Sequence, residues 1–403
     1  MKTEKLMDYI GQIDDDIIAQ AEDGMVKSKQ TKRFLAQWVS IGVAAAACLI
    51  VAVTFMMSRE QPSGPVDYSG LPKLTINAES GLEMGFEGYM AFDISELSNG
   101  NPWNASEVIK TLPVFQNPVS YDDSWNPSGG LTVDEMKEKA SQAATALGVT
   151  VESVFTNPTE EMIQMQKEKD PTAPTPTPYE AVAICGDVTI RVLPNGQVRV
   201  FFDDAVSLLE QYSLTYDNTT AQQARDVVLY LLEEYPAVVD MNSPAIDIIG
   251  QYTYFAQIGF SFSAYENSGN ITERIIGYNF NRVKFSPNDD GELWIIDRYY
   301  WDLSQKIGDY PIITAAEAQT LLLSNHYITT VPEVLPGEGY IASVELVYRT
   351  GRQDTVFMPY YKFLVEMPTM QRDNGLKTFG AFYVPAVIGE YLEHMPLWDG
   401  GFN

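Results

Sequence analysis

Cysteine is scarce in this chain, and its scarcity excludes a class of protein. Of the 403 residues, two are cysteine. Cys48 lies in a long apolar run, which leaves Cys185 alone in the rest of the chain. The large C-terminal part therefore cannot close an internal disulfide. It is not a disulfide-stapled scaffold, and it must have a hydrophobic core large enough to stand alone.

Histidine is equally scarce, and this limits the catalytic chemistry available. His326 and His394 are the two histidines, so a serine or cysteine nucleophile that is activated by histidine would need one of them. Neither lies in a recognisable motif, and His326 follows an apparent helix end, where a cation favours the helix dipole. No G-x-S-x-G, H-E-x-x-H, C-x-x-C or phosphate-binding loop occurs. We therefore predict that the protein is not an enzyme and has no cofactor and no metal site.

Basic residues are also few. Lysine and arginine number 26 against 54 aspartates and glutamates, which gives a net charge of −28. Such a surface repels nucleic acid, because contact with phosphate needs lysine and arginine. The abundant carboxylates leave open a glycosidase built on a carboxylate pair, although turn formation explains the aspartates that precede Gly291. The densest positions are Asp122–Asp123, Asp203–Asp204 and Asp289–Asp290.

The chain does contain one long apolar run, from Leu35 to Met57, with no charge between Arg33 and Arg59. As a helix this run spans about 34 Å, enough to cross a hydrocarbon core of about 30 Å. Four basic residues lie between positions 27 and 33, before the run, and this predicts a cytoplasmic N-terminus. We expect a single-pass protein of the cell membrane with residues 34–58 as its transmembrane helix and an extracellular C-terminal domain. A cleaved signal peptide and a buried helix are the alternatives.

Residues 1–33 carry a pattern typical of an amphipathic helix. Leu6, Ile10, Ile13 and Ile17 are spaced by four, three and four positions, so they share one helix face. A lone helix cannot bury this stripe, which makes these four residues a candidate partner-binding surface. The alternatives are a second copy of the same helix, the membrane surface, and a frayed arm with an accidental stripe.

The stretch LMDYIGQIDDDIIAQAEDG, followed by KSKQTKR and the apolar run, resembles the start of many single-pass membrane proteins of gut Firmicutes. Some proteins of this layout are anti-sigma factors, so the resemblance implies a cytoplasmic regulatory partner such as a sigma factor or a kinase. The arm lacks the histidine and cysteine set of zinc-containing anti-sigma domains.

The region after the apolar run divides at three similar helix starts. Residues 59–130 are rich in proline, glycine, serine and asparagine, which predicts a stalk and a loosely structured lead-in. Three pairs then fit the capping box, in which a threonine and a glutamate or glutamine three positions later satisfy each other's backbone N–H groups. The pairs are Thr132 with Glu135, Thr220 with Gln223, and Thr314 with Glu317. Their near-equal spacing predicts three modules, at residues 131–218, 219–312 and 313–403.

Strand patterns follow each of these helix starts. VTIRVL and QVRVFF flank the turn residues Asn195 and Gly196, and further strand pairs flank PNDDG and GRQD. The predicted fold class is α+β: one transmembrane helix followed by about three extracytoplasmic modules, each a helix packed on an antiparallel sheet.

The stretches YPIITAAEAQTLLL and YIASVELVYR through YYKFLVEM resemble PepSY-like domains and extracytoplasmic regulators of the YycI/YycH type. With the membrane span, this resemblance implies a membrane-anchored sensor or regulator that binds an envelope protein, a peptide or a wall ligand without catalysis. A cell-envelope binding or scaffold protein is the alternative, followed by a carboxylate-based wall hydrolase.

Overall fold

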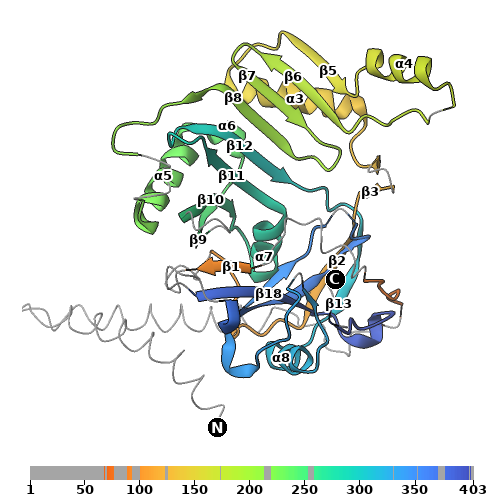
Figure 1. Cartoon of the computed structure of the whole chain (residues 1–403), viewed down its shortest axis with the longest axis vertical. Helices are drawn as coiled ribbons and strands as arrows, with labels where there is room; N and C mark the ends of the chain where they lie inside the picture. The colour runs from red at the N-terminus through yellow and green to blue at the C-terminus, as the bar shows by residue number, and fades with distance from the viewer. Residues whose placement is uncertain are drawn as a thin grey trace, which may run out of the picture. The chain divides into compact units, whose positions relative to one another are not determined.

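The structure is a computed structural model of the whole chain. It describes residues 68, 70–76, 89–92, 100–122, 126–172, 174–212, 219–252, 258–329, 331–351, 353–370, 377–398 and 400. Residues 68–403 form one compact unit, in which antiparallel sheet dominates and helices are few (Figure 1). The arm stripe Leu6, Ile10, Ile13 and Ile17 and the apolar run lie outside the described residues.

One long sheet contains most of the strands. Its first part is an eight-stranded array in which every neighbouring pair is antiparallel. In sheet order the strands are β9 (Pro244–Tyr252), β10 (Ile258–Glu266), β11 (Asn281–Pro287), β12 (Leu293–Tyr300), β8 (Val198–Val206), β7 (Val188–Val192), β6 (Glu180–Cys185) and β5 (Ser153–Asn157).

The sheet continues into a second part through β1, which meets β9 at one residue pair, Ala91 with Tyr252. The strands here are β1 (Tyr89–Phe92), β18 (Lys377–Pro385), β17 (Pro359–Glu366) and β15 (Ile341–Tyr348), and β14 (Ile328–Thr329) pairs with β18. Two small sheets accompany it: β13 (Lys306–Pro311), β2 (Thr111–Gln116) and β16 (Val356–Phe357) form one, and β3 (Val119–Tyr121) and β4 (Pro127–Gly129) form the other.

The described helices are short and mostly begin at capping boxes. They are α3 (Val133–Leu147), α4 (Glu160–Lys169), α5 (Ala221–Glu234), α6 (Pro236–Val239), α7 (Ile271–Phe280), α8 (Ala315–Leu323) and the 3₁₀ turns η3 (Glu338–Tyr340), η4 (Pro368–Met370) and η5 (Gly389–Tyr391). The boxes predicted at Thr132, Thr220 and Thr314 are confirmed. A fourth box, Asn270 with Glu273, starts α7.

Alternation of side chains along the strands places the core. In β8, Val198, Val200 and Phe202 are buried while Arg199 and Phe201 are partly exposed, as expected for a strand with one covered face. Helices α3, α5 and α6 cover that face of the eight-stranded part. A second cluster joins α7 and α8 to β15, β17 and β18, and Phe280 at the end of α7 lies within it.

The predicted fold class is wrong. The strands of the first two predicted modules pair edge to edge: β8 and β12 are in register from Arg298 opposite Val198 to Ile295 opposite Phe201, and after a register shift Leu293 lies opposite Val206. One sheet therefore crosses a supposed module boundary. Capping boxes mark only where helices begin, and they carry no information about which strand edges meet.

The predicted single-pass topology is corrected as well. Within the described residues no helix is long and apolar enough to cross a membrane. The longest helix there, α3, has 15 residues and spans only about 22 Å at 1.5 Å per residue. The structure therefore does not support a transmembrane helix at residues 34–58, or a membrane localisation with a cytoplasmic N-terminus and an extracellular domain.

Candidate functional site

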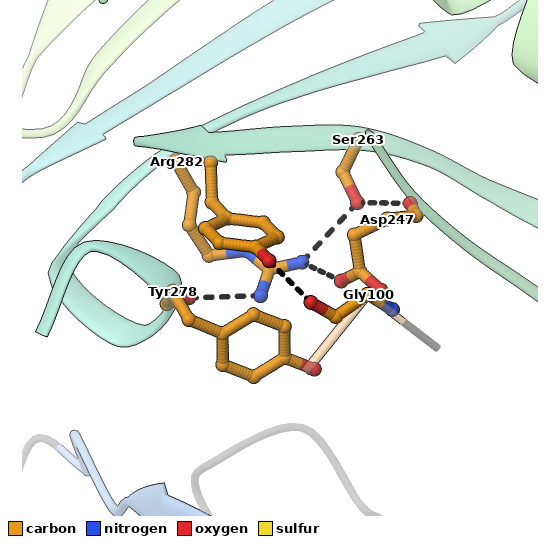
Figure 2. Close-up of polar contacts among 6 residues, drawn as sticks. Gly100, Asp247, Ser263, Tyr278 and Arg282 are labelled. Atoms are coloured by element: carbon orange, nitrogen blue, oxygen red, sulfur yellow. Dashed lines mark hydrogen bonds and ion pairs between the residues drawn. The ribbon is translucent and has the colours of Figure 1, made fainter. Parts of the chain in front are cut away.

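The strongest buried electrostatic feature is an ion pair on β9, β10 and β11 (Figure 2). Arg282 Nη2 donates to Asp247 Oδ2 and, at 3.2 Å, to Ser263 Oγ. Arg282 Nη1 donates to the Tyr278 carbonyl at 2.9 Å, and the Gly100 N–H donates to Asp247 Oδ1 at 2.8 Å. The Asp247 side chain is 1% exposed and that of Arg282 is 24% exposed. Both carboxylate oxygens of Asp247 are therefore occupied by donors from the chain itself.

This cluster holds the segment that follows Gly100 against the sheet. Tyr265 donates its hydroxyl to the Gly100 carbonyl, and a Cβ at position 100 would lie 2.7 Å from the Ile246 carbonyl oxygen, so only glycine fits. Burial raises the pKa of Tyr265 to about 12, and the Asp247 carboxylate raises the pKa of Arg282 against the effect of burial. Because each partner is already engaged, the cluster stabilises the fold and offers no free group for a ligand.

A hollow of about 950 Å³ lies at the end of β11 and β12, and we call it the α3–α7 hollow. Its volume is in the range of small-molecule and peptide sites. Its lining combines residues from α3, including Lys139, the β7–β8 turn, including Asn195, and α7, including Ile276, with Tyr300 at the end of β12 and residues 301–305 after it. These segments are distant in sequence, and the sheet brings them together.

The β7–β8 turn fixes the start of α3 at the edge of this hollow. The Leu131 N–H donates to the Pro194 carbonyl at 2.7 Å. Gly130 has φ +68, and a Cβ there would lie 2.3 Å from the same carbonyl oxygen. Only glycine allows this close approach, which sets the position of α3 and therefore of Lys139. The predicted hairpin turn at Asn195 and Gly196 is confirmed.

Two cations converge on one aromatic ring beside the hollow. Lys139 Nζ lies 5.9 Å from the centroid of the Tyr300 ring, and the Arg298 guanidinium lies 5.6 Å from it. Such distances allow cation–π attraction. Tyr300 is 56% exposed, so its ring also presents a surface to the hollow.

The two cations are held differently. Arg298 is buried and donates to the backbone carbonyls of Arg282, Tyr299 and Asp240 at 3.1, 2.6 and 3.3 Å. Burial lowers the pKa of Arg298 to about 10, so it stays charged at neutral pH. Burial also lowers the pKa of Lys139, and the charge of Arg298 lowers it further. Among the described residues Lys139 forms no ion pair and no hydrogen bond, so its ammonium group is available to a ligand.

Four carboxylates line the hollow, and each already accepts a backbone N–H group. Asp302 Oδ1 accepts the Ser304 N–H at 2.9 Å. Glu135 and Glu273 accept the backbone N–H groups of Thr132 and Asn270 in capping boxes, at 2.8 and 2.7 Å. Glu266 accepts three backbone N–H groups, those of residues 242, 243 and 268. The bond from the Thr132 backbone lowers the pKa of Glu135. A carboxylic acid that donates a proton in catalysis needs a raised pKa, so Glu135 is unsuited to that role.

A second hollow of about 580 Å³ adjoins the first and shares Gly129, Gly130, Leu131 and Pro194 with it. It is bordered by β3 and β4. Its acidic residue Asp122 accepts the Asn126 N–H at 2.9 Å, which closes the turn between these strands.

Two further residues singled out in the sequence, Asp290 and His326, have structural partners. Asp290 donates its N–H to Asn288 Oδ1 in the β11–β12 turn, as predicted for a turn residue. His326 lies after the end of α8 and its Nδ1 is 2.9 Å from the Pro396 carbonyl oxygen. Within the described part of the chain, no group of three or more histidine, cysteine, aspartate or glutamate side chains gathers as a metal site.

Sequence reasoning missed Lys139, Arg298 and Tyr300. Lys139 and Tyr300 belong to segments that meet only through the pairing of β8 with β12. The sole local signal is Lys139 on the helix flank beside the buried residues Met136 and Ala140, and a lysine there is ordinary. Comparison of the chain with protein-family models and with curated proteins finds no match.

Proposed function

We propose that the chain is a non-catalytic binding protein with a regulatory role, and that its ligand occupies the α3–α7 hollow. The observation that carries this proposal is the ammonium group of Lys139, which lines the hollow and has no hydrogen bond or ion pair with another described residue. A partly buried ammonium group is usually paired with an anion. A ligand that supplies an anionic group for Lys139 therefore gains binding free energy without displacing an existing contact.

The engaged carboxylates favour binding over hydrolysis. A glycosidase needs one carboxyl group that holds a proton and a second that acts as base or nucleophile. Glu135, Glu266 and Glu273 each accept backbone N–H groups that maintain helix starts or a turn, so a change of protonation in any of them would weaken the fold.

The test is a ligand screen on the full chain with a variant that fills the hollow. Ser304 is exposed and lines the hollow, so Ser304→Trp should block the site without disturbing the core. Ser153→Trp, at an exposed position on β5, is the matched control. Short peptides and wall saccharides would be screened by ligand-observed NMR. We expect ligands whose binding is lost in Ser304→Trp and retained in Ser153→Trp. Ligands that bind equally to both variants, or release of cleaved sugar, would contradict the proposal.

The regulatory role rests on the sequence of residues 1–33. The stripe Leu6, Ile10, Ile13 and Ile17 supports the proposal that this arm contacts a protein partner. Changing all four residues to serine in the full chain should abolish cross-linking to that partner and leave binding in the hollow unchanged. If the unaltered protein and the four-serine variant gave the same cross-linked products, the proposed regulatory role would be contradicted.

A further inference from the structure

The Lys139 ammonium group, which has no anionic partner among the described residues, indicates the chemical class of the ligand of the α3–α7 hollow. We propose that the hollow binds a short peptide through one carboxylate group, with Lys139 as the counter-ion of that carboxylate. This inference rests on the proposed function and adds the identity of the ligand class.

The first argument is the position of Lys139 relative to the other charges. Lys139 has no carboxylate partner among the described residues. Lys139 instead faces the ring of Tyr300 and lies close enough to Arg298 for repulsion between the two cations. A ligand carboxylate would relieve this repulsion and form a charge-assisted hydrogen bond with Lys139 Nζ.

The second argument is the amide chemistry of the lining. Asn281 lines the hollow, and its Oδ1 is buried without a hydrogen-bond donor among the described residues. A buried acceptor without a donor costs free energy, and a peptide N–H would satisfy it. Asn281 lies opposite Tyr300 in the β11–β12 register, so the orphaned acceptor and the ring near Lys139 belong to neighbouring positions of one sheet.

The third argument is the apolar part of the lining. Ile276 and Phe280 come from α7, and Trp301 and Leu303 follow β12. These side chains suit an apolar or aromatic residue next to the carboxylate. A ligand with several negative charges fits less well, because the hollow is also lined by four carboxylates that repel each additional anion: Glu135, Glu266, Glu273 and Asp302. A single carboxylate beside an apolar residue engages Lys139 and the apolar lining with the least repulsion from these groups.

Three probes separate the sources of the carboxylate. The first is N-acetyl-alanyl-phenylalanyl-alanine with a free carboxyl terminus. The second is the same peptide with an amidated terminus. The third is N-acetyl-glutamyl-phenylalanyl-alanine amide, in which a side chain supplies the only carboxylate. Affinities for the full chain would be measured by isothermal titration calorimetry.

We expect the first or the third probe to bind at least about tenfold more tightly than the second, since one charge-assisted hydrogen bond accounts for such a ratio. Tight binding of the first probe would assign the carboxylate to the peptide terminus. Tight binding of the third would assign it to a side chain. Lys139→Met should remove this preference, and Lys139→Arg should restore it in part. Lys137→Met, on the same helix but outside the lining, is the matched control and should leave it unchanged.

The outcomes distinguish this inference from the proposed function. Equal affinities for all three probes, with binding lost in Ser304→Trp, would overturn the carboxylate assignment while the hollow remains a ligand site. Tighter binding of inorganic phosphate than of any peptide probe would also overturn it. If no probe binds at millimolar concentration, the peptide assignment fails, and the wider ligand screen then decides the proposed function separately.

A pH series adds a readout that a merely structural lysine would not produce. Because burial and Arg298 lower the pKa of Lys139, the preference for the carboxylate probe should decline with rising pH before an ordinary lysine would lose its proton. In Lys139→Arg the preference should persist to higher pH, since arginine stays protonated. An identical pH profile for the two proteins would contradict the role of Lys139.

Discussion

Asp247 and Arg282 form an ion pair that spans β10, because Asp247 lies on β9 and Arg282 on β11. Ser263 on the intervening strand is in register with Asp247 and accepts a hydrogen bond from Arg282. The pair therefore joins three strands and, through Gly100, the segment that leads to β2. Removal of one member would leave the charge of the other without its counter-ion.

We expect Asp247→Asn to lower the free energy of unfolding by about 3 kcal/mol, near the lower end for a broken buried pair because Arg282 keeps some exposure. Denaturant unfolding of the full chain measures this change. The control is Asp309→Asn, which breaks the exposed pair with Lys306 and should cost less than about 1 kcal/mol. Equal losses for the two variants would show that the buried pair has no special role.

Gly277 allows α7 to lie against the end of β10. A Cβ at this position would lie 1.9 Å from the Glu266 carbonyl oxygen, so Gly277→Ala must displace the helix that forms one wall of the hollow. Although alanine favours helix by about 1 kcal/mol, we expect a net loss of about 1–3 kcal/mol in the free energy of unfolding. Gly339→Ala, where no heavy atom lies within 4 Å, should change it by less than about 0.5 kcal/mol. A stabilised Gly277→Ala protein would contradict the close approach.

The capping threonines should differ in their effect on stability. Thr220 starts α5, which buries Ala224, Val227, Val228, Leu231 and Leu232, so Thr220→Ala should cost about 1 kcal/mol of global stability. Thr159 starts α4, which buries no residue. Thr159→Ala should speed amide exchange within α4 and leave the global unfolding free energy unchanged. A global loss from Thr159→Ala would mean that α4 unfolds together with the sheet.

Tyr327 should make the free energy of unfolding fall as the pH rises into the alkaline range. Burial raises its pKa from 10.0 to about 12. Between these values the unfolded chain loses a proton that the folded chain keeps, so stability that is complete below pH 10.0 falls as the pH rises towards about 12. The Tyr327 hydroxyl has no hydrogen-bond partner among the described residues. Tyr327→Phe should therefore raise the unfolding free energy at neutral pH by about 1 kcal/mol.

The same variant should also weaken the decline of stability at alkaline pH. Denaturant unfolding at several pH values, with tyrosinate absorbance recorded in parallel, measures both effects. A destabilised Tyr327→Phe protein would indicate that the hydroxyl makes a favourable interaction in solution.

Local signals in the sequence predicted much of the secondary structure. The capping boxes at Thr132, Thr220 and Thr314 and the Asn195–Gly196 turn are formed by neighbouring residues, and the structure contains them. The prediction of three modules was wrong because it relied on the spacing of these local signals. The box at Asn270, which starts with asparagine instead of threonine, lies between two of the predicted starts and breaks their apparent period.

Long-range pairing was beyond the reach of these patterns. Nothing in the sequence of β8 or β12 states that Val198 lies opposite Arg298, since apolar alternation fixes which face is buried but not which edge is paired. The α3–α7 hollow depends on that pairing, because it brings Lys139 to Tyr300. The length of the apolar run at residues 34–58, its lack of charge and the basic residues before it predicted a membrane span, which the described helices do not support.

The most direct test of the binding site is the acylation rate of Lys139 in the full chain, measured by peptide mass spectrometry with and without a pool of short peptides that carry a carboxylate as a free terminus or as a glutamate side chain. The account predicts that these peptides slow the acylation of Lys139, that Lys137 on the same helix reacts at an unchanged rate, and that a pool of amidated peptides without acidic side chains gives no protection. An acylation rate of Lys139 that neither pool changes would contradict it.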